Sequence, residues 1–140
     1  MQLVPNLNFS GQCRDALHAY EKAFQGQITC LITYGEANDP AYLPLLREDQ
    51  LDYVYHAELA LGNQRIIMSD HVDLPLQPCY TNFLTVMFDR VADVKRAYAA
   101  LQEGSTTIYP MEKTAYSACR VAFVDRFGIR WGIMVEGNEV

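Results

Sequence analysis

The chain opens with a change in the spacing of its apolar residues. Asn6 and Asn8 alternate with apolar neighbours, which predicts a strand with both asparagines on one face. Four apolar residues then recur every three or four positions, as on one face of a helix: Cys13, Leu17, Tyr20 and Phe24. We therefore expect a helix over 12–24, ended by a left-handed Gly26, and a β-branched strand over 27–33.

The clearest alternation runs over 53–61 and predicts a half-buried strand. Its aromatic and aliphatic side is expected to pack on the helix, so that His56 and Glu58 share the opposite face. Gly62 and Asn63 have the composition of a two-residue hairpin turn, which leads into a strand over 64–70. The segments on either side of this hairpin contain proline and glycine and are expected to be irregular links.

The second half of the chain repeats this order of elements. A helix is expected between an N-cap at Asp89 and a glycine stop at Gly104. Its buried face is predicted to hold Val94, Ala97, Tyr98 and Leu101. The strands expected around it cover 81–88, 105–109, 116–125 and 129–135. The sequence therefore predicts an α+β fold, with a single domain over 1–140 made of two βαβββ modules, about 1–72 and 73–140.

Composition narrows the classes of partner. The formal net charge is −6, which argues against nucleic acid, because that affinity comes mostly from Lys and Arg neutralising phosphates. No apolar run approaches the roughly 20 residues that span a bilayer, and the N-terminus lacks the pattern of a signal peptide. The four cysteines are expected to be buried thiols of a cytoplasmic protein: Cys13, Cys30, Cys79 and Cys119.

Four segments give the chain a family resemblance. They are Leu7-Asn8-Phe9-Ser10-Gly11, His56-Ala57-Glu58-Leu59, Ile67-Met68-Ser69-Asp70 and Val124-Asp125-Arg126-Phe127-Gly128. Together with the paired βαβββ order, they resemble PhnB-like members of the vicinal oxygen chelate superfamily. The resemblance implies the glyoxalase/bleomycin resistance/dioxygenase fold. The chain departs from PhnB-like proteins at Ala115-Tyr116-Ser117, where those proteins usually carry Phe-Trp-Gly.

The resemblance also implies where a metal ion would bind. In metal-using members of the superfamily, the first and last strands of each module supply four ligands to one divalent ion. The corresponding positions here are Val4 or Pro5, Met68, Thr81 and Gly132, and none of them offers an imidazole or a carboxylate. A shift of one residue brings in Asn6 or Ser69 instead, and these side chains lack both groups as well. The sequence therefore predicts no metal ion at these positions, and no cofactor.

His56 and Glu58 remain the main polar candidates, with Asp70 ending the adjacent strand. They can be a general acid and base or an unusual metal site. Alternatively, they are a histidine and a carboxylate that hydrogen-bond to each other and to cavity water. The residues expected to line a ligand pocket are Asn6, Asn8, His56, Glu58, Asp70, Tyr116 and Arg130.

Two functions follow from these expectations. The first is a metal-free protein that holds a small cationic or aromatic ligand in a cavity between the modules. The second is an isomerase, lyase or dioxygenase with a rearranged site at His56, Glu58 and Asp70. In either case we expect a homodimer with no nucleic-acid or membrane partner.

Overall fold

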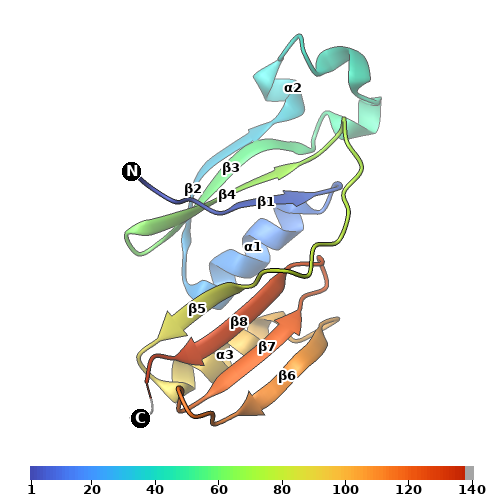
Figure 1. Cartoon of the computed structure of the whole chain (residues 1–140). Helices are drawn as coiled ribbons and strands as arrows, with labels where there is room; N and C mark the ends of the chain where they lie inside the picture. The colour runs from blue at the N-terminus through green and yellow to red at the C-terminus, as the bar shows by residue number, and fades with distance from the viewer. Residues whose placement is uncertain (138–140) are drawn as a thin grey trace. The chain divides into compact units, whose positions relative to one another are not determined.

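Each half of the chain forms a four-stranded mixed sheet with one helix on one of its faces (Figure 1). The computed structural model describes residues 1–137. It divides into two units, Met1–Gln77 and a second beginning at Pro78, so the division falls in the proline-bearing link that follows residue 70. No helix within the described residues is both long and apolar enough to cross a bilayer. The two βαβββ modules confirm the α+β prediction.

Sheet A belongs to the first unit and has the strand order β1-β4-β3-β2. Its elements are β1 (Asn6–Phe9), α1 (Cys13–Phe24), β2 (Gln27–Thr33), β3 (Val54–Leu61) and β4 (Gln64–Asp70). β1 runs parallel to β4, and the other pairs are antiparallel. The four apolar residues at helical spacing are all buried in α1, as the sequence predicts: Cys13, Leu17, Tyr20 and Phe24.

The long link between β2 and β3 is more ordered than the sequence predicts. It contains the short helix α2 (Tyr34–Ala37) and two 3-10 turns, Leu43–Leu45 and Glu48–Gln50. The rings of Tyr34, Tyr42 and Tyr55 meet edge to face, with centroids 5.3–5.9 Å apart. The Tyr55 hydroxyl also donates to the Asp39 carboxylate at 2.9 Å. These contacts fix the link against β3.

Sheet B belongs to the second unit and has the equivalent strand order β5-β8-β7-β6. Its elements are β5 (Leu84–Phe88), α3 (Val91–Leu101), β6 (Thr106–Glu112), β7 (Arg120–Val124) and β8 (Arg130–Val135). Val94, Ala97 and Leu101 are fully buried on α3. Tyr98 is half-buried, and its ring packs on the Phe123 ring with the two centroids 5.0 Å apart. The predicted strand 116–125 is shorter, because residues 113–119 form a loop.

Two predicted helix boundaries are wrong. The left-handed residue after α1 is Gln25, with φ of 53°, and not Gly26. Gly26 is instead a point of close approach, where an added Cβ would lie 2.8 Å from the carbonyl oxygen of Ala60. Asp89 does not cap α3, since the N-cap position is occupied by Arg90 without a capping side-chain bond.

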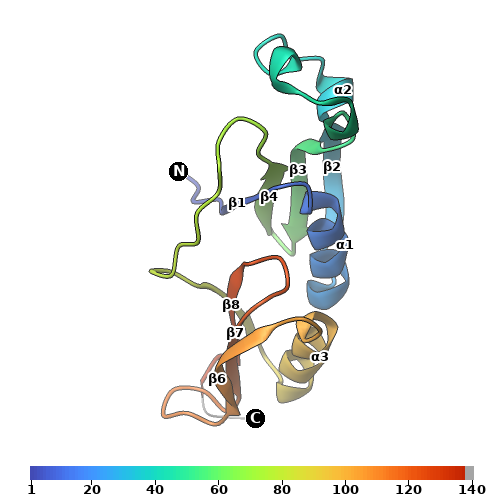
Figure 2. The ribbon, with the colours of Figure 1, turned by 90° about the vertical axis from the view of Figure 1, so that its right-hand side faces the viewer.

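Each sheet has one face covered by its own helix and one face that no other helix or strand of the described part of its unit covers. Figure 2 shows α1 on one side of sheet A and α3 on one side of sheet B. We call the opposite sides the open face of sheet A and the open face of sheet B. Side chains alternate between the two faces along each strand, so the register decides which residues reach the open faces.

Candidate functional site

The open face of sheet A collects polar side chains from all four strands. Ala57, Leu59, Ile66 and Met68 are buried on the side of α1, so the residues between them in β3 and β4 point the other way. The register of β1 and β2 adds their neighbours on the same face. The polar members of the open face include Asn6, Asn8, Gln27, Cys30, His56, Glu58, Arg65 and Ser69.

Two side-chain contacts order this face. The Ser69 hydroxyl donates to the Asn8 side-chain oxygen at 3.2 Å, and this bond joins β4 to β1. The Arg65 guanidinium lies 3.2 Å from the Glu58 carboxylate. The partner of Glu58 is therefore Arg65, and not His56 as the simpler interpretation of the sequence expects. Of the predicted pocket residues, Asn6, Asn8, His56 and Glu58 share this face.

The structure adds Cys30 to this group. The ligand atoms of Cys30, His56 and Glu58 all lie within 4.8 Å of one another, and all three residues are half-buried. Cys30 comes from β2, while His56 and Glu58 are two residues apart on β3. Sequence reasoning missed this residue, because it treated Cys30 as a buried strand cysteine. A thiol, an imidazole and a carboxylate in one place can act as proton carriers or as metal ligands.

Asp70 lies apart from this group, on the side of the helix. It is 1% exposed, and its carboxylate accepts N–H bonds from Gly11 at 2.7 Å, Cys13 at 3.0 Å and Val54 at 2.9 Å. The Tyr34 hydroxyl donates to its backbone carbonyl at 2.7 Å. Asp70 thus joins the start of α1 to β3 and β4. Both its oxygens are already engaged by the backbone.

The open face of sheet B holds two arginines rather than the single one the sequence suggests. Arg130 on β8 lies over the rings of Phe83 at 4.0 Å and Tyr80 at 5.3 Å, and it donates to the backbone carbonyl of Tyr80. Arg120 on β7 lies 3.5 Å from Glu112 and 4.9 Å from the centre of the Tyr109 ring. Its Nε and Nη1 are buried without a partner in the described residues.

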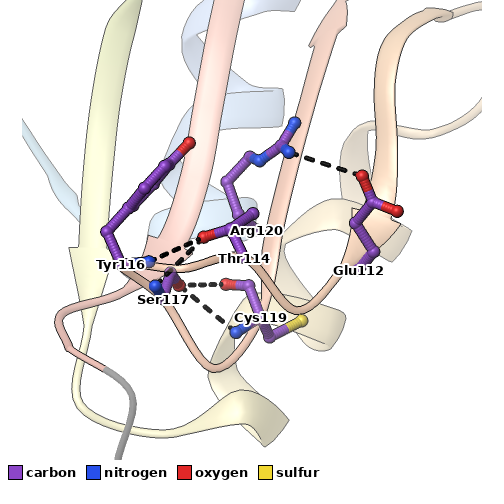
Figure 3. A network of polar contacts seen from close by, with 6 residues as sticks. All are labelled: Glu112, Thr114, Tyr116, Ser117, Cys119 and Arg120. Atoms are coloured by element: carbon purple, nitrogen blue, oxygen red, sulfur yellow. Dashed lines mark hydrogen bonds and ion pairs between the residues drawn. The ribbon is translucent and has the colours of Figure 1, made fainter.

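Tyr116 lies in the loop before β7, which begins at Arg120. Figure 3 shows both side chains extending in the same direction from the base of the loop. The loop is closed by Thr114, whose hydroxyl accepts from the backbone N–H of Ser117 at 3.0 Å and of Tyr116 at 3.3 Å. Ser117 is fully buried, and its hydroxyl lies 2.9 Å from the Cys119 carbonyl oxygen. Tyr116 is 56% exposed.

The cysteines differ in exposure, so the prediction that all four are buried is only partly right. Cys13 and Cys119 are buried, Cys30 is half-buried and Cys79 is exposed; all are free thiols. Burial raises the pKa of Cys13. The hydrogen bond to the Thr81 hydroxyl lowers the pKa of Cys79, with a smaller contribution from the charge of Arg130.

Comparison with known proteins shows which sequences and folds this chain resembles. No family model matches the sequence. The chain is 26% identical over 141 residues to protein YjdN of Escherichia coli K12, covering 96% of this chain and 95% of YjdN. The crystal structure of protein PA1353 from Pseudomonas aeruginosa matches with a TM-score of 0.84 and 29% identity, covering 97% of this chain and 98% of PA1353.

Two further structures match at the level of the fold. The PhnB protein from Bacillus cereus has a TM-score of 0.76 at 17% identity, covering 96% of this chain and 99% of its own. A glyoxylase/bleomycin resistance protein/dioxygenase domain from Frankia has a TM-score of 0.65 at 10% identity, covering 100% and 95%. The chain has the glyoxalase/bleomycin resistance/dioxygenase fold. The PhnB protein is among the solved structures that share this fold with the chain.

The metal positions that the resemblance implies can be located in the fold of this chain. They belong to the first and last strands of each module, which are paired here as β1 with β4 and β5 with β8. Met68 is wrongly assigned to such a position, since it is fully buried on the side of α1. Thr81 is wrongly assigned too, since it precedes β5, which begins at Leu84.

The residues that occupy the paired open-face positions do not suit a divalent ion. In sheet A they are Asn8 and Ser69, which bond to each other. In sheet B they are Thr85 and Gly132, which are register partners; a Cβ on Gly132 would lie 3.2 Å from the Thr85 hydroxyl. Neither pair supplies an imidazole or a carboxylate. No step of any reaction is therefore assigned to a metal at these strands.

Proposed function

We propose that this PhnB-like protein binds a small molecule through side chains of its open sheet faces, without a metal ion on the first and last strands of its modules. The observation that carries the proposal is the replacement of the metal-ligand pairs by Asn8–Ser69 and Thr85–Gly132. Asn8, Ser69 and Thr85 offer amide and hydroxyl groups, which suit hydrogen bonding to a neutral or weakly charged ligand. A cavity between the modules, as the place of this ligand, stays a prediction.

The aromatic and guanidinium groups of the second unit favour a planar ligand. Tyr109 and Tyr116 are 53% and 56% exposed, and the Arg120 guanidinium lies over the Tyr109 ring. Rings and guanidinium planes both stack on aromatic ligands. The positive charges of the two arginines on the open face of sheet B disfavour a cationic ligand at that face, although the whole chain carries a net charge of −6. Of the two ligand classes the sequence suggests, the aromatic one has the better support.

A thermal-shift panel tests this proposal. The panel contains aromatic acids, such as benzoate and naphthoate, and aromatic amines, all with EDTA present. We expect at least one compound to stabilise the protein, since a ligand at 100 times its dissociation constant adds about 2.7 kcal/mol. The shift should shrink in Asn8→Ala and His56→Ala. It should persist in Asn63→Ala, a change in an exposed hairpin turn. No stabilising compound, or equal shifts in all the variants, would contradict the proposal.

A second candidate function is an enzyme with a rearranged site on the open face of sheet A. The observation that favours it is the convergence of Cys30, His56 and Glu58 within 4.8 Å. We expect such an enzyme to turn over a hemithioacetal or a catechol when a divalent metal is added. His56→Gln should abolish that turnover. Equal rates in wild type and in His56→Gln would reject the catalytic alternative and leave the binding proposal untouched.

A further inference from the structure

Three metal-binding side chains converge on the open face of sheet A, away from the strands that carry the superfamily's metal ligands. Cys30 Sγ, a His56 ring nitrogen and a Glu58 carboxylate oxygen lie within 4.8 Å of one another. They come from the adjacent strands β2 and β3, where Cys30 is the register partner of Glu58. Thiolate, imidazole and carboxylate are all donors that Zn²⁺ accepts, and three protein ligands leave a tetrahedral ion one open position.

A β-bulge in β2 places Cys30 on this face. Ile28 pairs with Leu59, but Cys30 pairs with Glu58, so Thr29 is one residue extra on β2. With regular alternation, Cys30 would point to the same side as Ile28, which is the side of Leu59 and α1. The bulge therefore turns the Cys30 side chain towards Glu58 and His56. Re-aiming a side chain in this way is a common use of bulges beside functional sites.

The surroundings of the three residues suit an ion that enters from solvent. All three are half-buried, so their ligand atoms are neither sealed in the core nor fully hydrated. The register places Ile32 beside His56 and Ile67 beside Glu58, which gives the group apolar neighbours. Arg65 is the only cation paired with Glu58 in the described residues, at 3.2 Å, and its side chain is 49% exposed. A divalent ion has to compete with that guanidinium for the carboxylate.

We propose that Cys30, His56 and Glu58 form a binding site for one divalent transition-metal ion of the zinc class. The site differs from the superfamily's metal centre, because it uses two middle strands of one module. It goes beyond the proposed function, with which it shares His56, and does not depend on it, because ligand binding is tested with EDTA present and the site is tested by metal binding alone. The fourth position on the ion is open to water or to a ligand.

Titration of chelator-treated protein with Co²⁺ tests the site. A thiolate ligand gives cobalt a sulfur-to-metal charge-transfer absorption, so the readout reports Cys30 directly. We expect saturation at one ion per chain. Cys30→Ser should abolish the charge-transfer band, and Cys79→Ser, at the exposed thiol, should leave it unchanged. His56→Asn and Glu58→Gln should weaken binding by more than the roughly 10–100-fold that loss of a supporting partner costs.

Arg65→Gln supplies a variant that changes affinity in the opposite direction. Removing the competing guanidinium should tighten binding about two- to fivefold, as expected for a partly exposed ion pair. Bound Zn²⁺ should also protect Cys30, but not Cys79, from alkylation. The proposal is overturned if no charge-transfer band appears, if the band survives Cys30→Ser, or if Zn²⁺ leaves Cys30 alkylation unchanged. If no compound stabilises the protein in the thermal-shift panel, the ligand-binding proposal fails, but the metal-site proposal is unaffected.

Discussion

Asp70 shows at the scale of one residue how a polar side chain can serve the fold. Its carboxylate accepts three backbone N–H bonds from segments that are far apart in the sequence. An amide at this position has only one acceptor oxygen, so Asp70→Asn leaves a buried N–H unpaired. We expect the variant to lose about 2–4 kcal/mol of unfolding free energy. Urea unfolding measures this loss, with Asp52→Asn at an exposed position as the control; equal stabilities would show that the carboxylate is dispensable.

Ionisation of Tyr34 is expected to lower the free energy of unfolding at alkaline pH. Burial, followed by the negative charge of its neighbours when they ionise, raises its pKa to about 12 from the ordinary value near 10. Because the pKa of Tyr34 is higher in the folded state than in the unfolded state, its neutral hydroxyl stabilises the fold fully below about pH 10. This stabilisation is lost as the pH rises towards 12. Tyr34→Phe removes this contribution, together with the hydrogen bond to the Asp70 carbonyl.

We therefore expect wild type to exceed Tyr34→Phe by about 0.5–1.5 kcal/mol at neutral pH. The difference should shrink between about pH 10 and 12, where only wild type has this hydroxyl to ionise. Unfolding curves of both proteins at several pH values measure the difference directly. A gap that stays constant through pH 12 would show that Tyr34 does not titrate with a raised pKa.

At the scale of elements, the sequence predicted which segments form helices and strands better than it predicted which side of the sheet a residue faces. The helical spacing of Cys13, Leu17 and Tyr20 and the alternation around His56 were sufficient to predict α1 and β3, because burial of one face imposes those periods. The side of the sheet that Cys30 faces was not predictable. It depends on the extra residue at Thr29, and a bulge leaves no mark in a short β-branched strand.

The end of α1 gives a paired prediction for adjacent residues. Gln25 has a left-handed conformation without being a glycine, so Gln25→Gly should raise stability by about 1 kcal/mol. Gly26→Ala should lower it by about 1–3 kcal/mol, since the new Cβ meets the Ala60 carbonyl oxygen at 2.8 Å. Thermal unfolding of both variants measures the two changes. Stability changes of the same sign would contradict this account of the helix end.

At the scale of the whole molecule, we expect two chains to associate. β1 and β2 are the edge strands of sheet A, and β5 and β6 are the edges of sheet B. Exposed edges and partly apolar faces favour symmetric pairing, with an interface above roughly 1,000 Å². Sedimentation at micromolar concentration should give twice the chain mass of 15.9 kDa. A single-chain mass that does not change with concentration would rule out the dimer.

The open faces of this molecule are proposed to hold a small organic molecule. The most direct measurement is non-denaturing mass spectrometry of the protein taken from crude lysate into EDTA-containing buffer. We expect the mass of the polypeptide plus an organic adduct, and we expect Asn8→Ala and His56→Ala to lose that adduct. Bare polypeptide in every preparation, or an adduct equally retained by both variants, would contradict the claim.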